Sequence, residues 1–186
     1  LETMNAFADA VDAGQIRAVG VSNFRAGEMR EAHAALARRG VPLATNQVHY
    51  SLLHRSPEVD GVLDTCRELG VTLLAYSPLE QGLLCGTYDT GIRPAAPRSE
   101  AMWFSPDNVA AAQPVVAALR EMADRHGVDA AAVALAWLLA KPGVVPLAGA
   151  KTGEQATRNA KAIGVSLSEA EMAALDRLTE PWRVAG

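Results

Sequence analysis

Residues 71–79 read VTLLAYSPL, and this stretch decides the fold class. Residues 71–77 are almost entirely apolar, which predicts a strand buried on both faces, as in a parallel sheet. Two further strand patterns, at 16–22 and 43–48, precede it, and the three patterns start 27 and 28 residues apart. Helical patterns that precede and separate the strands lie at residues 2–13, 26–38 and 57–69. This alternation indicates repeated strand–helix units.

The pattern changes after residue 79. Residues 79–106 contain several Pro and Gly and few periodic apolar positions, which predicts a long loop. Two helices are expected next, at 108–126 and 129–141, and Pro114 should kink the first or mark its real start. A fourth strand is expected at 144–150. Two more helices are predicted. The first covers residues 153–162. The second begins at Ser166 or Ser168, where Ser168 and Glu171 form a capping-box pattern.

The predicted fold class is α/β, with a parallel sheet and helices outside it. No Rossmann glycine fingerprint follows the first strand, so a (β/α)₈ TIM barrel is favoured over a doubly wound sheet. Eight units need about 250 residues, whereas this chain has 186 residues and shows four strands. Four strands alone would leave two open edges and an uncovered apolar face. We therefore expect part of the barrel to be missing.

Composition excludes several functional classes. A net charge of −4 and a pI near 5.6 give no basic footprint for nucleic acid. The longest apolar run, 130–140, is too short to span a bilayer and fits a buried helix better. Cys66 and Cys85 are expected to be free thiols, and no metal-site pattern is present. The chain begins with Leu1 rather than Met, so we expect the native start to be missing and read no targeting segment.

The expected carboxyl ends of the strands carry amide, hydroxyl and aromatic groups but no evident acid–base pair. The most informative of them is 149–152. Gly149 allows close backbone approach, Lys151 adds a positive charge, and Thr152 can cap the following helix, whose free N–H groups favour an anion. The alternative is an ordinary helix cap beside a solvated lysine.

Four motifs occur in order along the chain: IRAVGVSNF at 16–24, NQVHY at 46–50, AYSPL at 75–79 followed by QGLL at 81–84, and VPLAGAK at 145–151. Together they resemble the aldo-keto reductase family over essentially the whole chain. The long loop is most similar to that of bacterial and plastid-type members. The resemblance implies that residues 1–186 are the C-terminal half of a single barrel domain, including the loop 79–106 and a C-terminal helix.

The resemblance also implies an NADP (NADPH) site. In that interpretation Ser22, Asn23 and Gln47 hold the nicotinamide carboxamide, and Tyr76 stacks on the nicotinamide ring. Four residues would border the pyrophosphate: Ser77, Leu79, Gln81 and Gly82. Four more would reach the adenosine end: Lys151 and Thr152 at the ribose phosphate, and Gln155 and Asn159 at the adenine. Many relatives have Glu directly before that Asn, whereas this chain has Arg158, which cannot accept a hydrogen bond.

The implied activity is reduction of small-molecule aldehydes or ketones by hydride transfer from NADPH. The family's catalytic Asp, Tyr, Lys and His come from earlier strands, so this chain is expected to lack them and to be inactive alone. A non-catalytic NADP(H)-binding regulatory or accessory subunit on the same fold is the alternative. The upstream sequence would distinguish the two. We expect an intracellular soluble protein, cytoplasmic or in the plastid stroma, with no nucleic-acid partner and no membrane span.

Overall fold

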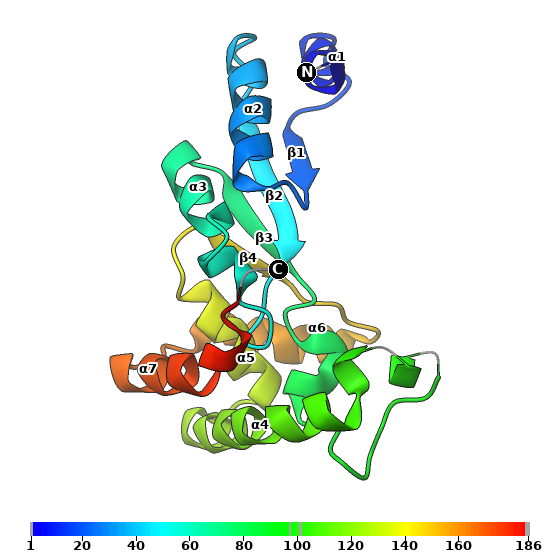
Figure 1. Cartoon of the computed structure of the whole chain (residues 1–186), viewed down its shortest axis with the longest axis vertical. Coiled ribbons are helices and arrows are strands. Elements are labelled where there is room, and N and C mark those ends of the chain that lie inside the picture. Colours follow the sequence, from blue (N-terminus) through cyan, green and yellow to red (C-terminus); the bar gives the residue numbers. More distant parts are fainter. Residues whose placement is uncertain (1, 97, 101, 185–186) are drawn as a thin grey trace.

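The computed structural model describes residues 2–96, 98–100 and 102–184. Four parallel strands lie side by side in chain order (Figure 1): β1 (Val19–Ser22), β2 (Leu43–His49), β3 (Thr72–Tyr76) and β4 (Val144–Leu147). All four predicted strands are confirmed, although three of them are shorter than expected. Of the predicted loop 79–106, Pro97 and Ala101 lie outside the described residues.

Seven α-helices are found in the part of the chain that is described: α1 (Glu2–Asp12), α2 (Ala26–Ala37), α3 (Val62–Leu69), α4 (Pro106–His126), α5 (Ala130–Leu139), α6 (Gly153–Ala160) and α7 (Glu169–Leu178). They follow the predicted alternation, with α4 and α5 together connecting β3 to β4. The capping box of Ser168 and Glu171 starts α7 as expected. The apolar run 130–140 forms α5, which is buried from Ala130 to Leu138.

The structure corrects one expectation about these elements and adds detail to two others. The segment 57–69 is not one helix, because a short 3₁₀ turn at Ser56–Glu58 is separated from α3 by Gly61, whose φ of 84° breaks the helical path. Pro114 does not mark the start of α4, which begins at Pro106 behind its cap Ser105 and runs through residue 114. Short 3₁₀ turns also interrupt the long loop.

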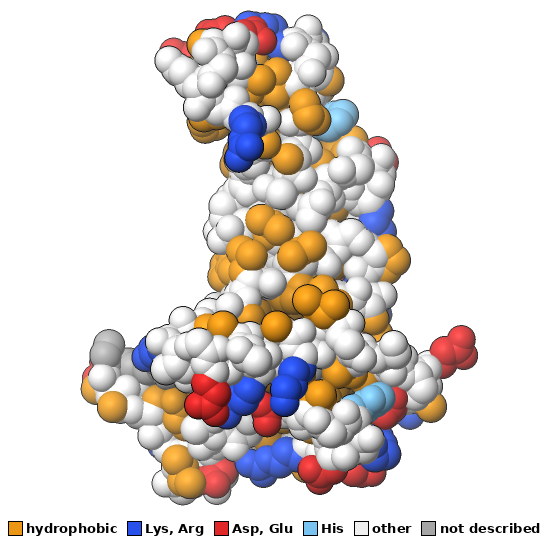
Figure 2. All heavy atoms as spheres, turned by 180° about the vertical axis from the view of Figure 1, so that it is seen from behind, with side chains coloured by type: hydrophobic (Ala, Val, Ile, Leu, Met, Phe, Trp, Pro, Cys, Tyr) orange, Lys and Arg blue, Asp and Glu red, His pale blue; other side chains and the backbone are white. Residues whose placement is uncertain are grey.

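The third strand is buried on one face rather than on both. Leu73 and Ala75 have no exposed surface, whereas the alternating residues Thr72, Leu74 and Tyr76 are only half-buried. The buried face packs against the helices. On the other face, Val145 and Leu147 of β4 also remain exposed. The molecule seen from behind shows hydrophobic side chains exposed along its middle (Figure 2).

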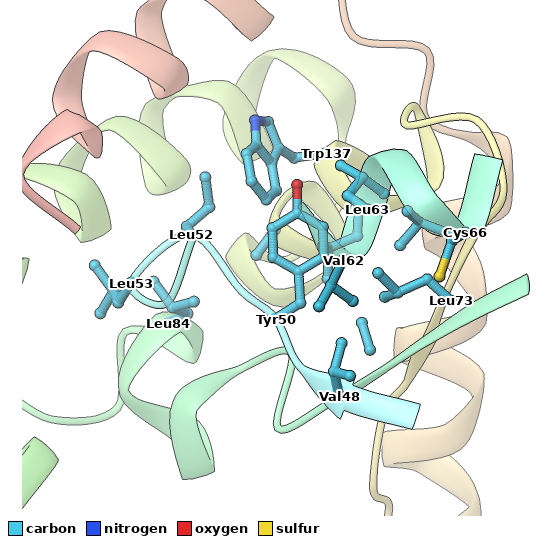
Figure 3. Close-up of a cluster of buried hydrophobic side chains, with 14 of the residues drawn as sticks. Val48, Tyr50, Leu52, Leu53, Val62, Leu63, Cys66, Leu73, Leu84 and Trp137 are labelled. Carbon is cyan, nitrogen blue, oxygen red and sulfur yellow. The ribbon is translucent and has the colours of Figure 1, made fainter. Parts of the chain in front are cut away.

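The buried side of the sheet continues into a core around Tyr50 (Figure 3). The Tyr50 ring meets Trp137 of α5 edge-on, with ring centroids 5.7 Å apart. Val48, Leu63 and Leu73 lie in the same cluster, so β2, β3 and α3 share one apolar interior. This packing fixes the positions of the strand ends, where the candidate site lies.

A buried polar network ties the C-terminal region to the segment after β2. Arg55, whose side chain is 4% exposed, donates to both carboxylate oxygens of Glu58, at 2.9 and 2.7 Å. It also donates to the hydroxyl of Thr179 and the backbone carbonyl of Asp176, at 2.8 and 2.9 Å. Burial alone would raise the pKa of Glu58, but hydrogen bonds from Arg55 and Tyr50 outweigh it and lower the pKa. The network therefore keeps Glu58 ionised and holds the chain end in place.

Cys66 and Cys85 are free, as predicted, and burial raises the pKa of the Cys66 thiol to about 11. Across the described ranges, no helix is both long and apolar enough to cross a membrane.

Candidate functional site

The first two strand ends are tied together by hydrogen bonds. The Ser22 hydroxyl donates to the Gln47 carbonyl at 3.0 Å, and the Asn23 backbone N–H donates to the same oxygen at 2.8 Å. Asn23 has a φ of 58°, a left-handed conformation that Asn tolerates better than most residues. The fold therefore brings Ser22, Asn23 and Gln47 together at the carboxyl ends of β1 and β2, as a common contact with one ligand group requires.

Asn46, the neighbour of Gln47 in the same motif, has a structural role. Its side chain is fully buried. Its amide nitrogen donates to the Phe24 carbonyl at 2.9 Å and lies 3.1 Å from the Met29 sulfur. Asn46 thus holds the loop after β1 in place from the buried face of the sheet. Gln47 points to the opposite, half-exposed face because side chains alternate along a strand.

Tyr76 is the last residue of β3, and its register partner on β2 is His49. The two rings stack with centroids 5.2 Å apart and an angle of 17° between planes. The His49 Nε2 atom lies 2.8 Å from the Glu80 carboxylate. A hydrogen bond between His49 and Glu80 therefore lies beside the strand ends, and the sequence analysis did not identify it. It was missed because its two partners lie 31 residues apart and on different elements.

A cavity of about 920 Å³ opens between the segment after β3 and the segment after β4. Seven of the twelve candidate residues line it: Ser77, Leu79, Gln81, Gly82, Lys151, Gln155 and Asn159. The other five lie outside its lining: Ser22, Asn23, Gln47 and Tyr76 at the strand ends, and Thr152 at the start of α6. The structure thus separates the candidates into a strand-end group and a cavity group.

The backbone between β3 and the cavity takes left-handed conformations at three residues other than Gly. Ser77, Glu80 and Gln81 have φ values of 51°, 46° and 52°. Such strain persists only where surrounding contacts hold it, and it clusters at ligand sites. Gly82 has a φ of 104°, which favours glycine, and a Cβ at this position would lie 3.2 Å from the Tyr88 ring.

The α6 end of the cavity is a small hydrogen-bonded turn. The Thr152 hydroxyl accepts from the Gln155 N–H at 3.2 Å, which confirms the predicted helix cap. The Gln155 side-chain oxygen accepts from the Lys151 N–H at 2.7 Å, and the Asn159 amide donates to the Gly149 carbonyl at 3.3 Å. Both amide side chains therefore shape this turn, while the Lys151 side chain stays exposed.

Three cations and two carboxylates line the cavity: Arg120, Lys151, Arg158, Asp124 and Asp129. Arg158 lies 3.7 Å from Asp129 and 3.9 Å from Glu154, so its charge is partly balanced. Arg120 donates to the Gly86 carbonyl and comes from the middle of α4. No local pattern distinguishes Arg120 from other helix-surface arginines, and the sequence analysis therefore missed it.

A model of the aldo/keto reductase family matches residues 1–180. The chain belongs to the aldo-keto reductase family. The order of the four motifs, the parallel strands and the cavity at their carboxyl ends agree with this membership. The α/β fold with its parallel sheet matches that of TIM-barrel structures in the same family.

Known aldo-keto reductases and related oxidoreductases align along nearly the whole chain. An uncharacterized oxidoreductase of Mycobacterium tuberculosis is 39% identical over 94% of this chain and 53% of its own length. An NADH-specific methylglyoxal reductase of Escherichia coli is 31% identical over 96% of this chain and 53% of its own. The crystal structure of a thermostable aldo-keto reductase with the inhibitor epalrestat is 36% identical, with a TM-score of 0.72, and aligns with 95% of this chain and 54% of the other. The chain spans about half the length of the curated relatives it matches.

Proposed function

We propose that the complete protein is an NADPH-dependent oxidoreductase that reduces aldehydes or ketones to alcohols. In this proposal, residues 1–186 are the C-terminal half of one TIM-barrel domain and supply its cofactor site. The observation that supports it most is the cavity between the ends of β3 and β4, whose lining contains three cations, among them Lys151, and two carboxylates.

The uncovered face of the sheet supports the half-barrel part of the proposal. Val145 and Leu147 of β4 are 43% and 41% exposed, although large apolar side chains in strands are usually covered. In a closed barrel this face would be the filled interior, because inward-pointing side chains pack there in layers. Packing against further strands would bury these residues.

The residues present fit a phosphorylated dinucleotide. The cavity volume lies within the range of small-molecule sites. A Cβ built on Gly149 or Gly153 meets no atom within 4 Å, so there is room for a ligand to approach the backbone. Lys151 precedes the helix start, where unpaired N–H groups and a positive charge act together on an anion. A ribose phosphate is the group that these features suit best, and NADP carries one there while NAD does not.

Each part of the site would have a distinct task. When bound, the nicotinamide would supply the hydride. Ser22, Asn23 and Gln47 would hold its carboxamide, and the Tyr76 ring would fix the face that it presents. The turn from Ser77 to Gly82 would border the pyrophosphate, and Thr152, with Gln155 and Asn159, would shape the adenosine end. These residues bind and orient, so we assign the acid that protonates the product to residues outside 1–186.

The test uses the complete polypeptide that contains this segment and, separately, residues 1–186. NADPH binding is followed by its fluorescence, and turnover by the loss of NADPH absorbance with a panel of aldehydes and ketones. We expect both in the complete protein and no turnover by residues 1–186 alone. Turnover by the segment would place the acid inside it. Binding without turnover by the complete protein would favour the accessory-subunit alternative.

A further inference from the structure

Three aromatic rings stack at the carboxyl ends of β2 and β3. The His54 and His49 rings are nearly parallel, with centroids 3.9 Å apart and an angle of 6° between planes. The other neighbour in the stack is Tyr76, 5.2 Å from His49 at 17°. Trp103, from the long loop, meets both histidines edge-on at 84° and 81°. The Tyr76 ring is therefore nearly parallel to the His49 ring, which in turn stacks on His54.

The buried side chain of Glu80 holds the His49 ring of this stack by a hydrogen bond. Its side chain is 1% exposed, and its Oε1 atom accepts hydrogen bonds from the Ser51 hydroxyl and, at 2.8 Å, from His49 Nε2. The Oε2 atom has no partner among the described residues. A buried carboxylate with so few donors depends strongly on each of them. The contact with His49 is therefore difficult to break, and it fixes the imidazole ring at one edge.

The stack lies next to the proposed nicotinamide contacts. His49 follows Gln47 by two positions on β2, so both side chains point to the same face of the sheet. Tyr76 is the register partner of His49 on the neighbouring strand. A nicotinamide ring that reaches both Gln47 and Tyr76 must therefore lie beside His49.

We propose that His49 and Glu80 are positioning residues that set the plane of the Tyr76 ring. This inference rests on the proposed function, in which Tyr76 is the surface on which the nicotinamide stacks. Glu80 acts through His49, because it forms a hydrogen bond with the imidazole ring that stacks on Tyr76. His49 itself is poorly placed as a proton donor, since its side chain is only 14% exposed, Nε2 faces Glu80 and rings stack on it.

The test compares two ligands on the complete protein: NADPH, and the adenosine bisphosphate that corresponds to its adenine end. The His49→Ala substitution should weaken NADPH roughly 3- to 10-fold, the range expected from the loss of one aromatic pair. Binding of the bisphosphate should not change, because that ligand lacks the nicotinamide. His49→Phe should recover most of the NADPH affinity by restoring a ring against Tyr76.

Glu80→Ala and Glu80→Gln test the anchor. The Ala variant should lose NADPH affinity selectively, whereas the Gln variant should keep most of it because its amide oxygen still accepts a hydrogen bond. His33→Ala, on α2, is the control histidine variant and should bind both ligands as the unmodified protein does.

Several results would overturn the assignment. Equal losses of both ligands would show a general structural role, and unchanged NADPH affinity in His49→Ala would show no role. Tighter NADPH binding in that variant would show that His49 competes for the Tyr76 ring. If the unmodified protein bound neither ligand, the proposed function itself would be refuted, and the positioning role with it.

Discussion

Replacing Lys151 by Ala should weaken NADPH binding far more than NADH binding in the complete protein. Lys151 is exposed and lines the cavity directly before the Thr152 cap of α6. A phosphate at this point would meet both the ammonium group and the helix N–H groups. Removal of Lys151 leaves the cap and the Gln155 hydrogen bond intact, because that bond uses the backbone N–H of residue 151.

The magnitude follows from the kind of contact that is lost. A hydrogen bond to a charged group contributes about 1.5–3 kcal/mol, which corresponds to a roughly 10- to 150-fold loss of affinity. Because Lys151 is exposed, solvent screening places the expected loss towards the lower end of this range. NADH lacks the phosphate, so its affinity should change by only about 2- to 3-fold, through the long-range charge alone.

Fluorescence titration of each variant with both cofactors measures this difference. Lys161→Ala is the matched control, because this substitution removes the same charge at the other end of α6. The eight residues of the helix separate the two lysines by about 12 Å. That separation exceeds the screening length of about 8 Å at physiological salt, so NADPH affinity should be nearly unchanged. Equal losses of NADPH and NADH in Lys151→Ala would refute the phosphate assignment, and Arg158 would be the next residue to test.

Three further predictions concern the Tyr76 ring and the stability of the complete protein. Tyr76→Ala should weaken NADPH and NADH alike, because they share the nicotinamide, and a selective loss in the same titrations would contradict its role. Arg55→Ala should lower the free energy of unfolding by about 3–5 kcal/mol, since it leaves buried partners unpaired, whereas Arg30→Ala, which breaks an exposed ion pair, should change it by less than about 1 kcal/mol in urea denaturation. A hydrogen bond from the backbone of its helix cap lowers the pKa of Glu171 to about 2 from an ordinary 4.5, so its contribution to stability is complete above pH 4.5 and is lost as the pH falls towards 2. Urea midpoints measured across that window should fall less steeply for Glu171→Gln than for the unmodified protein, while Glu169→Gln should keep the full slope.

The sequence by itself predicted the features that depend on a few neighbouring residues. Strand-forming runs at regular spacing, with helices between them, predicted four parallel strands in chain order. The helix caps at Thr152 and Ser168 were readable because each hydroxyl bonds to an N–H three residues away. The motifs at the strand ends predicted the family, which the match over residues 1–180 confirms.

Only the tertiary structure determined which distant residues meet. Packing of the loop after β3 against β2 brings Glu80 to His49, and Arg55 contacts Asp176 across 121 residues of chain. The half-buried second face of β3 was not predictable either, because a run of apolar residues has the same pattern whether one or both of its faces are covered. The conformational preferences of residues act over a few neighbouring positions in the chain, whereas these contacts depend on how whole helices and strands pack against one another.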